Sequence, residues 1–164
     1  RAPSFEHHKQ DALPLIEDSD KRVRLIVGEA YGKAAPVSTY SEMFYADAYL
    51  KAGAQLPLPD NHEDRGVYVL EGDVSIAGER FETGQMMVFR PTDAITLTAG
   101  KKGAHIMLLG GATLEGPRYI KWNFVASSME KIDAAMEDWR KADWNNGSFL
   151  LPPDDQDEFI PAPD

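Results

Sequence analysis

One stretch of the chain concentrates residue types that can hold a metal ion. Asp60, Asn61, His62, Glu63 and Asp64 follow one another directly. Carboxylates together with an imidazole are competent ligands for divalent cations, so Asp60, His62 and Asp64 could form part of a metal site. The alternative is an acidic loop between strands, because two further donors would have to come from elsewhere in the chain.

The remaining candidates for chemistry are weaker. His105 stands in an apolar run, which favours a hydrogen-bonded or edge histidine over a metal ligand, and His7 and His8 lie in a polar segment where a solvated role is expected. The chain has no cysteine, which excludes disulfides, thiolate metal sites and a cysteine nucleophile. No G-x-S-x-G motif places a serine nucleophile. We therefore predict no catalytic residue in this chain.

Composition and charge narrow the class of protein. Hydrophobic residues make up 43% of the 164 positions, enough for a folded core. The 17 basic and 27 acidic residues give a net charge of −10, which opposes binding to nucleic acid. No apolar run reaches the roughly 18 residues that span a bilayer, so no membrane association is expected. Together with the lack of cysteine, this favours a cytoplasmic location.

Short runs rich in β-branched and aromatic residues begin at Val23 and recur about every 8 to 12 residues, which is typical of an all-β barrel or sandwich. About eight such strands are expected over residues 23–116, following an extended N-terminal arm over residues 1–22. Tight hairpins are predicted at residues 71–73 and at Ala77 and Gly78, where turn-forming residues interrupt the runs.

A single helix is predicted near the C-terminus. Met129, Ile132, Met136 and Trp139 recur on one helical face, and Ser127 precedes Glu130 by three residues, which is the pattern of a capping box. The helix should run over residues 129–142, within a segment 117–147 that packs on one side of the barrel. Residues 148–164 are proline-rich and acidic and are expected to form a solvated tail.

Several longer strings resemble one protein family. GVYVLEGDVSIAGERFETGQMMVF resembles a cupin. VRLIVGEAYGKAAPV, GGATLEGPRYIKWNFVASSMEKIDAAMEDWR and DEFIPAPD resemble successive parts of the C-terminal domain of bacterial pirins. The resemblance implies a double-stranded β-helix barrel of the cupin type with one C-terminal helix and extended N- and C-terminal arms.

The cupin motifs can be aligned with this sequence position by position. Gly53 and Gly72 match the spacing of the first motif, and Gly84 matches that of the second. The ligand positions then fall on four residues: Pro59, Asn61, Arg65 and Met87. None of the four is a good ligand for iron, zinc or manganese, which need three or four converging imidazole or carboxylate donors. The resemblance thus implies a degenerate metal site, with no cofactor in this chain.

Arg65 would add a permanent cation at a ligand position. We expect it to form a structural salt bridge. The alternative is that Arg65, with His62 and Asn61, binds a small anion in the mouth of the barrel.

The resemblance also bears on partners and function. Pirins usually contain two cupin barrels, with iron or another divalent metal in the first, and this chain resembles only the second. Because it begins at Arg1 rather than Met, we expect about half of a longer protein, truncated naturally, by proteolysis or by design. The half should be a non-catalytic structural or interaction module that supports the N-terminal cupin domain. By itself it should expose apolar surface and form a homodimer.

Two other functions stay open for the longer protein. Some pirins resemble quercetin 2,3-dioxygenases, and others resemble redox-sensing transcriptional co-regulators that contact protein partners.

Overall fold

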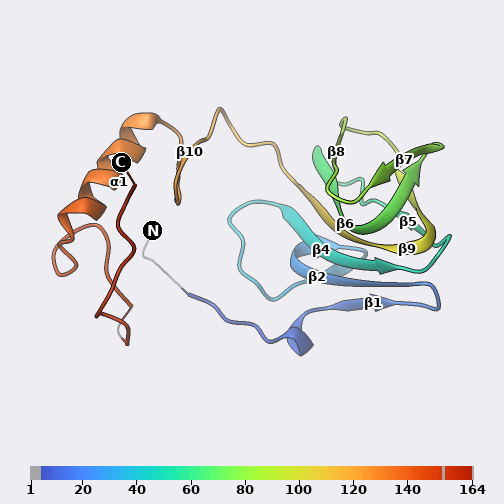
Figure 1. Ribbon diagram of the computed structural model, residues 1–164, viewed down its shortest axis with the longest axis horizontal. Coiled ribbons are helices and arrows are strands. Elements are labelled where there is room, and N and C mark those ends of the chain that lie inside the picture. Colours follow the sequence, from blue (N-terminus) through green and yellow to red (C-terminus); the bar gives the residue numbers. More distant parts are fainter. Residues whose placement is uncertain (1–4, 153, 164) are drawn as a thin grey trace. The chain divides into compact units, whose positions relative to one another are not determined.

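The computed structural model describes residues 5–152 and 154–163 (Figure 1). It divides into two compact units, one ending at Thr113 and one beginning at Leu114. The first unit is a β-sheet fold, and the second combines a short hairpin with a helix. Within the described residues, no helix is both long enough and apolar enough to cross a membrane.

The first unit is built on a nine-stranded antiparallel sheet. Its strands are β1 (Leu15–Glu17), β2 (Lys21–Ala30), β3 (Lys33–Ala34), β4 (Met43–Leu50), β5 (Gln55–Pro57), β6 (Asp64–Ile76), β7 (Glu79–Glu82), β8 (Met86–Phe89) and β9 (Thr96–Gly111). The main order is β1-β2-β4-β9-β6-β7, with β3 on β2, β5 on β9 and β8 on β6. A short 3-10 helix, Gln10–Ala12, precedes β1. The predicted all-β architecture is confirmed, although the sheet has one strand more than expected.

Alternation along the strands produces a single core. In β4, Phe44, Ala46, Ala48 and Leu50 are buried, while the residues between them face outward. Inward residues of β2, β5, β6, β8 and β9 join the same hydrophobic cluster. A strand places successive side chains on opposite faces, so one face of the bent sheet encloses the core and the other remains on the surface.

The predicted hairpin at residues 71–73 is wrong. Strand β6 runs through these residues, and its register with β9 shifts on both sides of Gly72. Gly72 has φ of 76°, and a β-carbon there would lie 2.2 Å from the carbonyl oxygen of Gly103. The glycine therefore marks a bulge with close backbone approach instead of a turn.

The second predicted hairpin is confirmed. Ala77 and Gly78 join β6 to β7 with φ of 50° and 88°. Two central residues with positive φ are the requirement of a type I′ turn, whose twist matches that of the flanking strands.

The N-terminal segment contributes more than an arm. Residues 15–17 form β1, which pairs with residues 22–24 of β2. Ile16 packs against the core, which explains why this part of the segment joins the sheet.

The second unit contains β10 (Tyr119–Lys121), β11 (Phe124–Ala126) and α1 (Met129–Lys141). The helix ends within one residue of the prediction, at Ala142 in the left-handed conformation. The capping residue is Ser128 instead of Ser127: its hydroxyl oxygen accepts from the Lys131 amide at 3.4 Å. The Ser127 hydroxyl oxygen accepts instead from the Lys131 ammonium group at 3.0 Å.

An aromatic cluster holds this unit together. The Trp139 ring contacts five others edge-on: Trp122, Phe124, Trp144, Phe149 and Phe159. Its indole nitrogen donates to the Ile160 carbonyl at 2.8 Å. The C-terminal segment is thus attached to the helix at Ile160, while the acidic residues Asp154, Asp155, Asp157 and Glu158 are exposed, as expected of a solvated tail. Packing of the helix on the sheet of the first unit stays a prediction.

The turn at Ala77 yields a first test. Alanine is strained at positive φ, whereas Asn-Gly is the favoured pair in a type I′ turn. Ala77→Asn should raise the free energy of unfolding by about 0.5–1 kcal/mol. The melting temperature followed by circular dichroism should rise by about 1–3 °C. Ala77→Val, the control, should lower it, because β-branched residues tolerate this conformation poorly. A lower melting temperature for Ala77→Asn would contradict the assigned turn.

Candidate functional site

Arg65 occupies the centre of the candidate site. It lies near the start of β6 with only 2% of its surface exposed, among the most buried large side chains of the chain. One terminal guanidinium nitrogen donates to the Pro59 carbonyl at 3.4 Å. The other donates to the carbonyls of Arg90 and Asp93, at 3.0 and 2.9 Å.

This geometry makes the guanidinium a cation coordinated by backbone oxygens. Its hydrogen-bond partners among the described residues are these carbonyls, so the predicted salt bridge is replaced by three carbonyl contacts. The Nε atom is buried and has no hydrogen-bond partner in this structure. A charge buried in this way depends on hydrogen bonds from fixed dipoles, because it has lost its hydration.

The other three ligand positions lie nearby but present little metal-binding chemistry. Pro59 offers only its carbonyl, which Arg65 already uses. Met87 is 6% exposed, pairs with Val67 in the sheet and belongs to the hydrophobic core. Asn61 lies in the loop between β5 and β6, and its amide is 3.5 Å from the His62 ring. An amide and a thioether are poor ligands for the metals that cupins hold.

The alternative site around His62 does not assemble. His62 is 8% exposed and stacks on Phe44, with ring centroids 5.4 Å apart, whereas Asp60 and Asp64 are exposed. Across residues 5–152 and 154–163, no group of three or more histidine, aspartate or glutamate side chains could hold a metal ion. A metal site formed by Asp60, His62 and Asp64 stays a prediction that the geometry does not favour.

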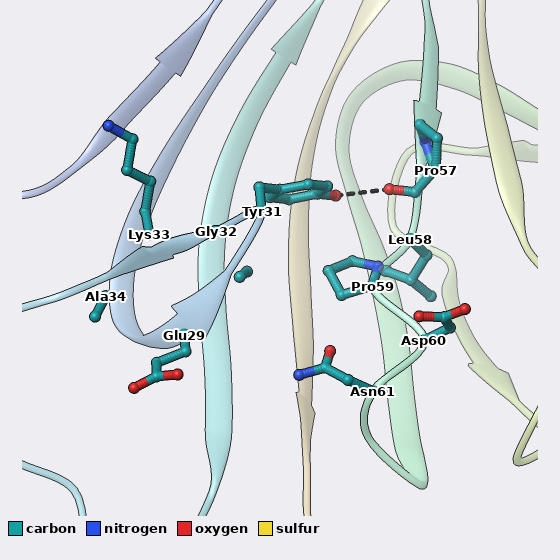
Figure 2. Close-up of a pocket in the computed structure, with 11 residues that line it drawn as sticks. Glu29, Tyr31, Gly32, Lys33, Ala34, Pro57, Leu58, Pro59, Asp60 and Asn61 are labelled. Atoms are coloured by element: carbon teal, nitrogen blue, oxygen red, sulfur yellow. Dashed lines mark hydrogen bonds between the residues drawn. The ribbon is translucent and has the colours of Figure 1, made fainter.

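A hollow of about 640 Å³ lies beside the β5–β6 loop (Figure 2). Figure 2 shows the Tyr31 ring crossing it, and the Tyr31 hydroxyl donates to the Pro57 carbonyl at 2.8 Å. Burial raises the pKa of Tyr31 above its usual value. The Asn61 amide points toward the side of the hollow where Glu29 lies. Tyr31 thus links the turn after β2 to the end of β5, directly before the loop that carries two of the ligand positions.

A second hollow of about 480 Å³ shares Glu29 and Asn61 with the first and is also lined by Glu42 and His62. Neither hollow is lined by Arg65. The predicted anion site needs the guanidinium of Arg65 beside His62 and Asn61, but Arg65 does not reach the surface of either hollow. An anion site formed by Arg65, His62 and Asn61 therefore stays a prediction.

His105 and His8 each contact a carboxylate. His105 contacts the Asp47 carboxylate at 2.5 Å and stacks on Tyr49 at 3.9 Å between centroids, so the prediction of a hydrogen-bonded histidine is confirmed. His8 lies 3.3 Å from the Glu6 carboxylate in an exposed pair.

Sequence reasoning missed the oxygens that hold Arg65. They are backbone carbonyls of the loops after β5 and β8, and every residue type offers such a group. Only the positive φ of Thr92, 69°, distinguishes the second loop, and the sequence gives no sign of it.

Comparison with known proteins agrees with the fold. The profile of the pirin C-terminal cupin domain matches residues 45–146. A pirin-like protein of Caulobacter vibrioides is 40% identical over 163 residues, covering 99% of this chain and 54% of that protein. Pirin of Mus musculus is 30% identical over 148 residues, covering 86% of this chain and 51% of that protein.

A solved structure shows the same relation. The crystal structure of quercetin 2,3-dioxygenase from Acinetobacter baumannii superposes with a TM-score of 0.76 at 27% identity, over 92% of this chain and 50% of that one. The chain spans about half the length of the curated relatives it matches. With the profile match and the 40% identity, these findings place the chain in the pirin family, in the part that corresponds to the C-terminal cupin domain.

Proposed function

We propose that this chain is a non-catalytic half of a pirin-like protein and supports a metal-binding first cupin domain. The observation that carries the proposal is the Arg65 guanidinium, which occupies a ligand position of the cupin motif and is bonded to three carbonyls. The half-length match to curated relatives adds support, because the relatives have room for one more domain of this size.

Electrostatic repulsion opposes the binding of a metal ion near Arg65. Arginine cannot be deprotonated in proteins, so a divalent ion near Arg65 would meet a permanent positive charge in a medium of low dielectric constant. The three carbonyl oxygens nearest this position already accept hydrogen bonds from that charge. The fold therefore has an internal cation where other cupins use a metal, and metal chemistry belongs to the first domain.

A second function applies to the longer protein. The superposition on a quercetin 2,3-dioxygenase at 27% identity favours a quercetin 2,3-dioxygenase-like oxidoreductase. In that case iron or another divalent metal in the first domain supplies the chemistry, and this half supplies only packing.

Support of a first domain is tested by co-expression. The part of the Caulobacter vibrioides relative that this chain does not match is produced with and without this chain. With the chain present, we expect a soluble one-to-one complex in size-exclusion chromatography, with the metal retained by the relative's part. Separate elution of two folded proteins would contradict the proposal.

The role of Arg65 is tested by Arg65→Met, which keeps an unbranched side chain and removes the cation. Three carbonyls lose their donor, so the free energy of unfolding in urea should fall by about 2–4 kcal/mol. Arg80→Met is the matched control. Arg80 also carries a guanidinium, but it is exposed and pairs with Asp73 and Glu82, so its loss should change stability little. Equal urea midpoints for the two variants would show that the carbonyl contacts do not stabilise the fold.

A further inference from the structure

The surface of the sheet opposite the core is rich in apolar side chains. We call it the outer sheet face and define it by outward residues of five strands: Val27, Tyr45, Tyr49, Gly66, Tyr68, Met86, Val88, Met107 and Leu109. Val88 is 76% exposed and Met86 47%, while Tyr45, Tyr49 and Tyr68 are each exposed by 36–41%. Apolar side chains gathered on one sheet surface are typical of an interaction site.

The strand register arranges these residues in rows across the sheet. One row runs Tyr45, Leu109, Gly66 and Val88 from β4 to β8. The next row along runs Asp47, Met107, Tyr68 and Met86. A third consists of Arg22, Tyr49, His105 and Glu71, from β2 to β6. Strand β9 is central, with β4 and β2 on one side and β6 and β8 on the other.

We propose that the outer sheet face binds the outer sheet face of a second copy of this chain, around a two-fold axis parallel to β9. The proposal goes beyond the proposed function, because it concerns what this chain does when the first domain is absent. The arrangement agrees with aligned packing of two sheets, in which mean strand directions lie within about 30° of each other.

This axis makes the face self-complementary. Rotation about this axis places β9 over β9 of the second copy and β4 over β6 of the second copy. Each Tyr45 ring therefore lies over the position of Gly66 in the other copy. Gly66 itself is buried, because the Met86 methyl group lies 2.6 Å from the position a β-carbon would take, so the Tyr45 ring meets the Met86 side chain that covers this glycine. The same operation brings Asp47 over a tyrosine, Tyr68, whose hydroxyl can donate to the carboxylate. An aromatic ring thus meets an apolar side chain, and a donor meets an acceptor.

Charge selects this axis over the alternative. Arg22, on β2, and Glu71, on β6, lie on opposite sides of β9, so the proposed axis brings them toward each other across the interface. An axis running across the strands at the row of Met107 would instead place each β2 antiparallel over the partner's β2, with Arg24, which pairs with Asp47 in that row, facing Arg24. Like charges face to face are unfavourable in an interface.

The size of the face sets the expected strength. Five strands about 4.8 Å apart and the eight residues of β4 at about 3.3 Å each give about 24 Å by 26 Å, or about 600 Å² per copy. Stable interfaces bury about 800 Å² per partner. A reversible dimer with a micromolar dissociation constant is therefore expected.

Sedimentation provides the first test. The chain should shift from monomer to dimer between low and high micromolar concentration. Met107→Glu places two carboxylates near the axis and should raise the dissociation constant at least tenfold. Ile120→Glu, a control at a 73% exposed position of the second unit, should leave it unchanged. A monomer mass at every concentration, or equal effects of the two variants, would overturn the proposal.

Cross-linking tests the axis itself and does not depend on the folding of a charged variant. The chain has no cysteine, so single cysteines can be introduced cleanly. With a short bis-maleimide, Leu109→Cys should cross-link to itself because it lies near the axis. Val88→Cys should cross-link poorly to itself but well to Val27→Cys in a mixture. Efficient self-linking of Val88→Cys with none at Leu109→Cys would overturn the proposed axis. These results are independent of the co-expression experiment, so either proposal can fail without the other.

Discussion

The contact between the Arg65 guanidinium and three backbone carbonyls links parts of the chain that the sheet alone would leave separate. Arg65 lies on β6, Pro59 in the loop before it, and Arg90 and Asp93 in the loop between β8 and β9. A metal ion performs this kind of linking when it draws ligands from several strands. Here a side chain performs it, so the end of the sheet can be ordered without a bound ion.

The strand period provides the second constraint. Alternation along β4 and its neighbours places small and branched residues in the core, and the same alternation puts three tyrosines on the opposite face. In a domain that works by itself, such a face is usually polar, because one side of an antiparallel sheet meets water. An apolar outer face suits a sheet that packs against a second sheet, as in the proposed dimer.

Much of the fold could be predicted from the sequence because it depends on local patterns. Alternating β-branched residues predicted the strands, and the spacing of Ile132 and Met136 predicted a helix with both residues buried. Gly72 led to a wrong hairpin prediction because glycine is common in both turns and bulges. Only the pairing of β6 with β9 shows that this glycine lies in a bulge. The attachment of the tail to the helix was not predicted, because the charge of the tail is evident in the sequence, whereas the hydrogen bond from Trp139 to a carbonyl is not. The position of Arg65 in the site could be predicted from the motif spacing. Its hydrogen-bond acceptors could not, because they are backbone carbonyls, which every residue type has.

The metal content of the chain, purified without a histidine tag, tests the central claim most directly. Elemental mass spectrometry should find less than about a tenth of an equivalent of any transition metal, because a permanent cation and poor ligands occupy the motif positions. About one equivalent of iron, zinc, manganese, copper or nickel would contradict the account. It would also direct attention to His62 and its neighbouring carboxylates.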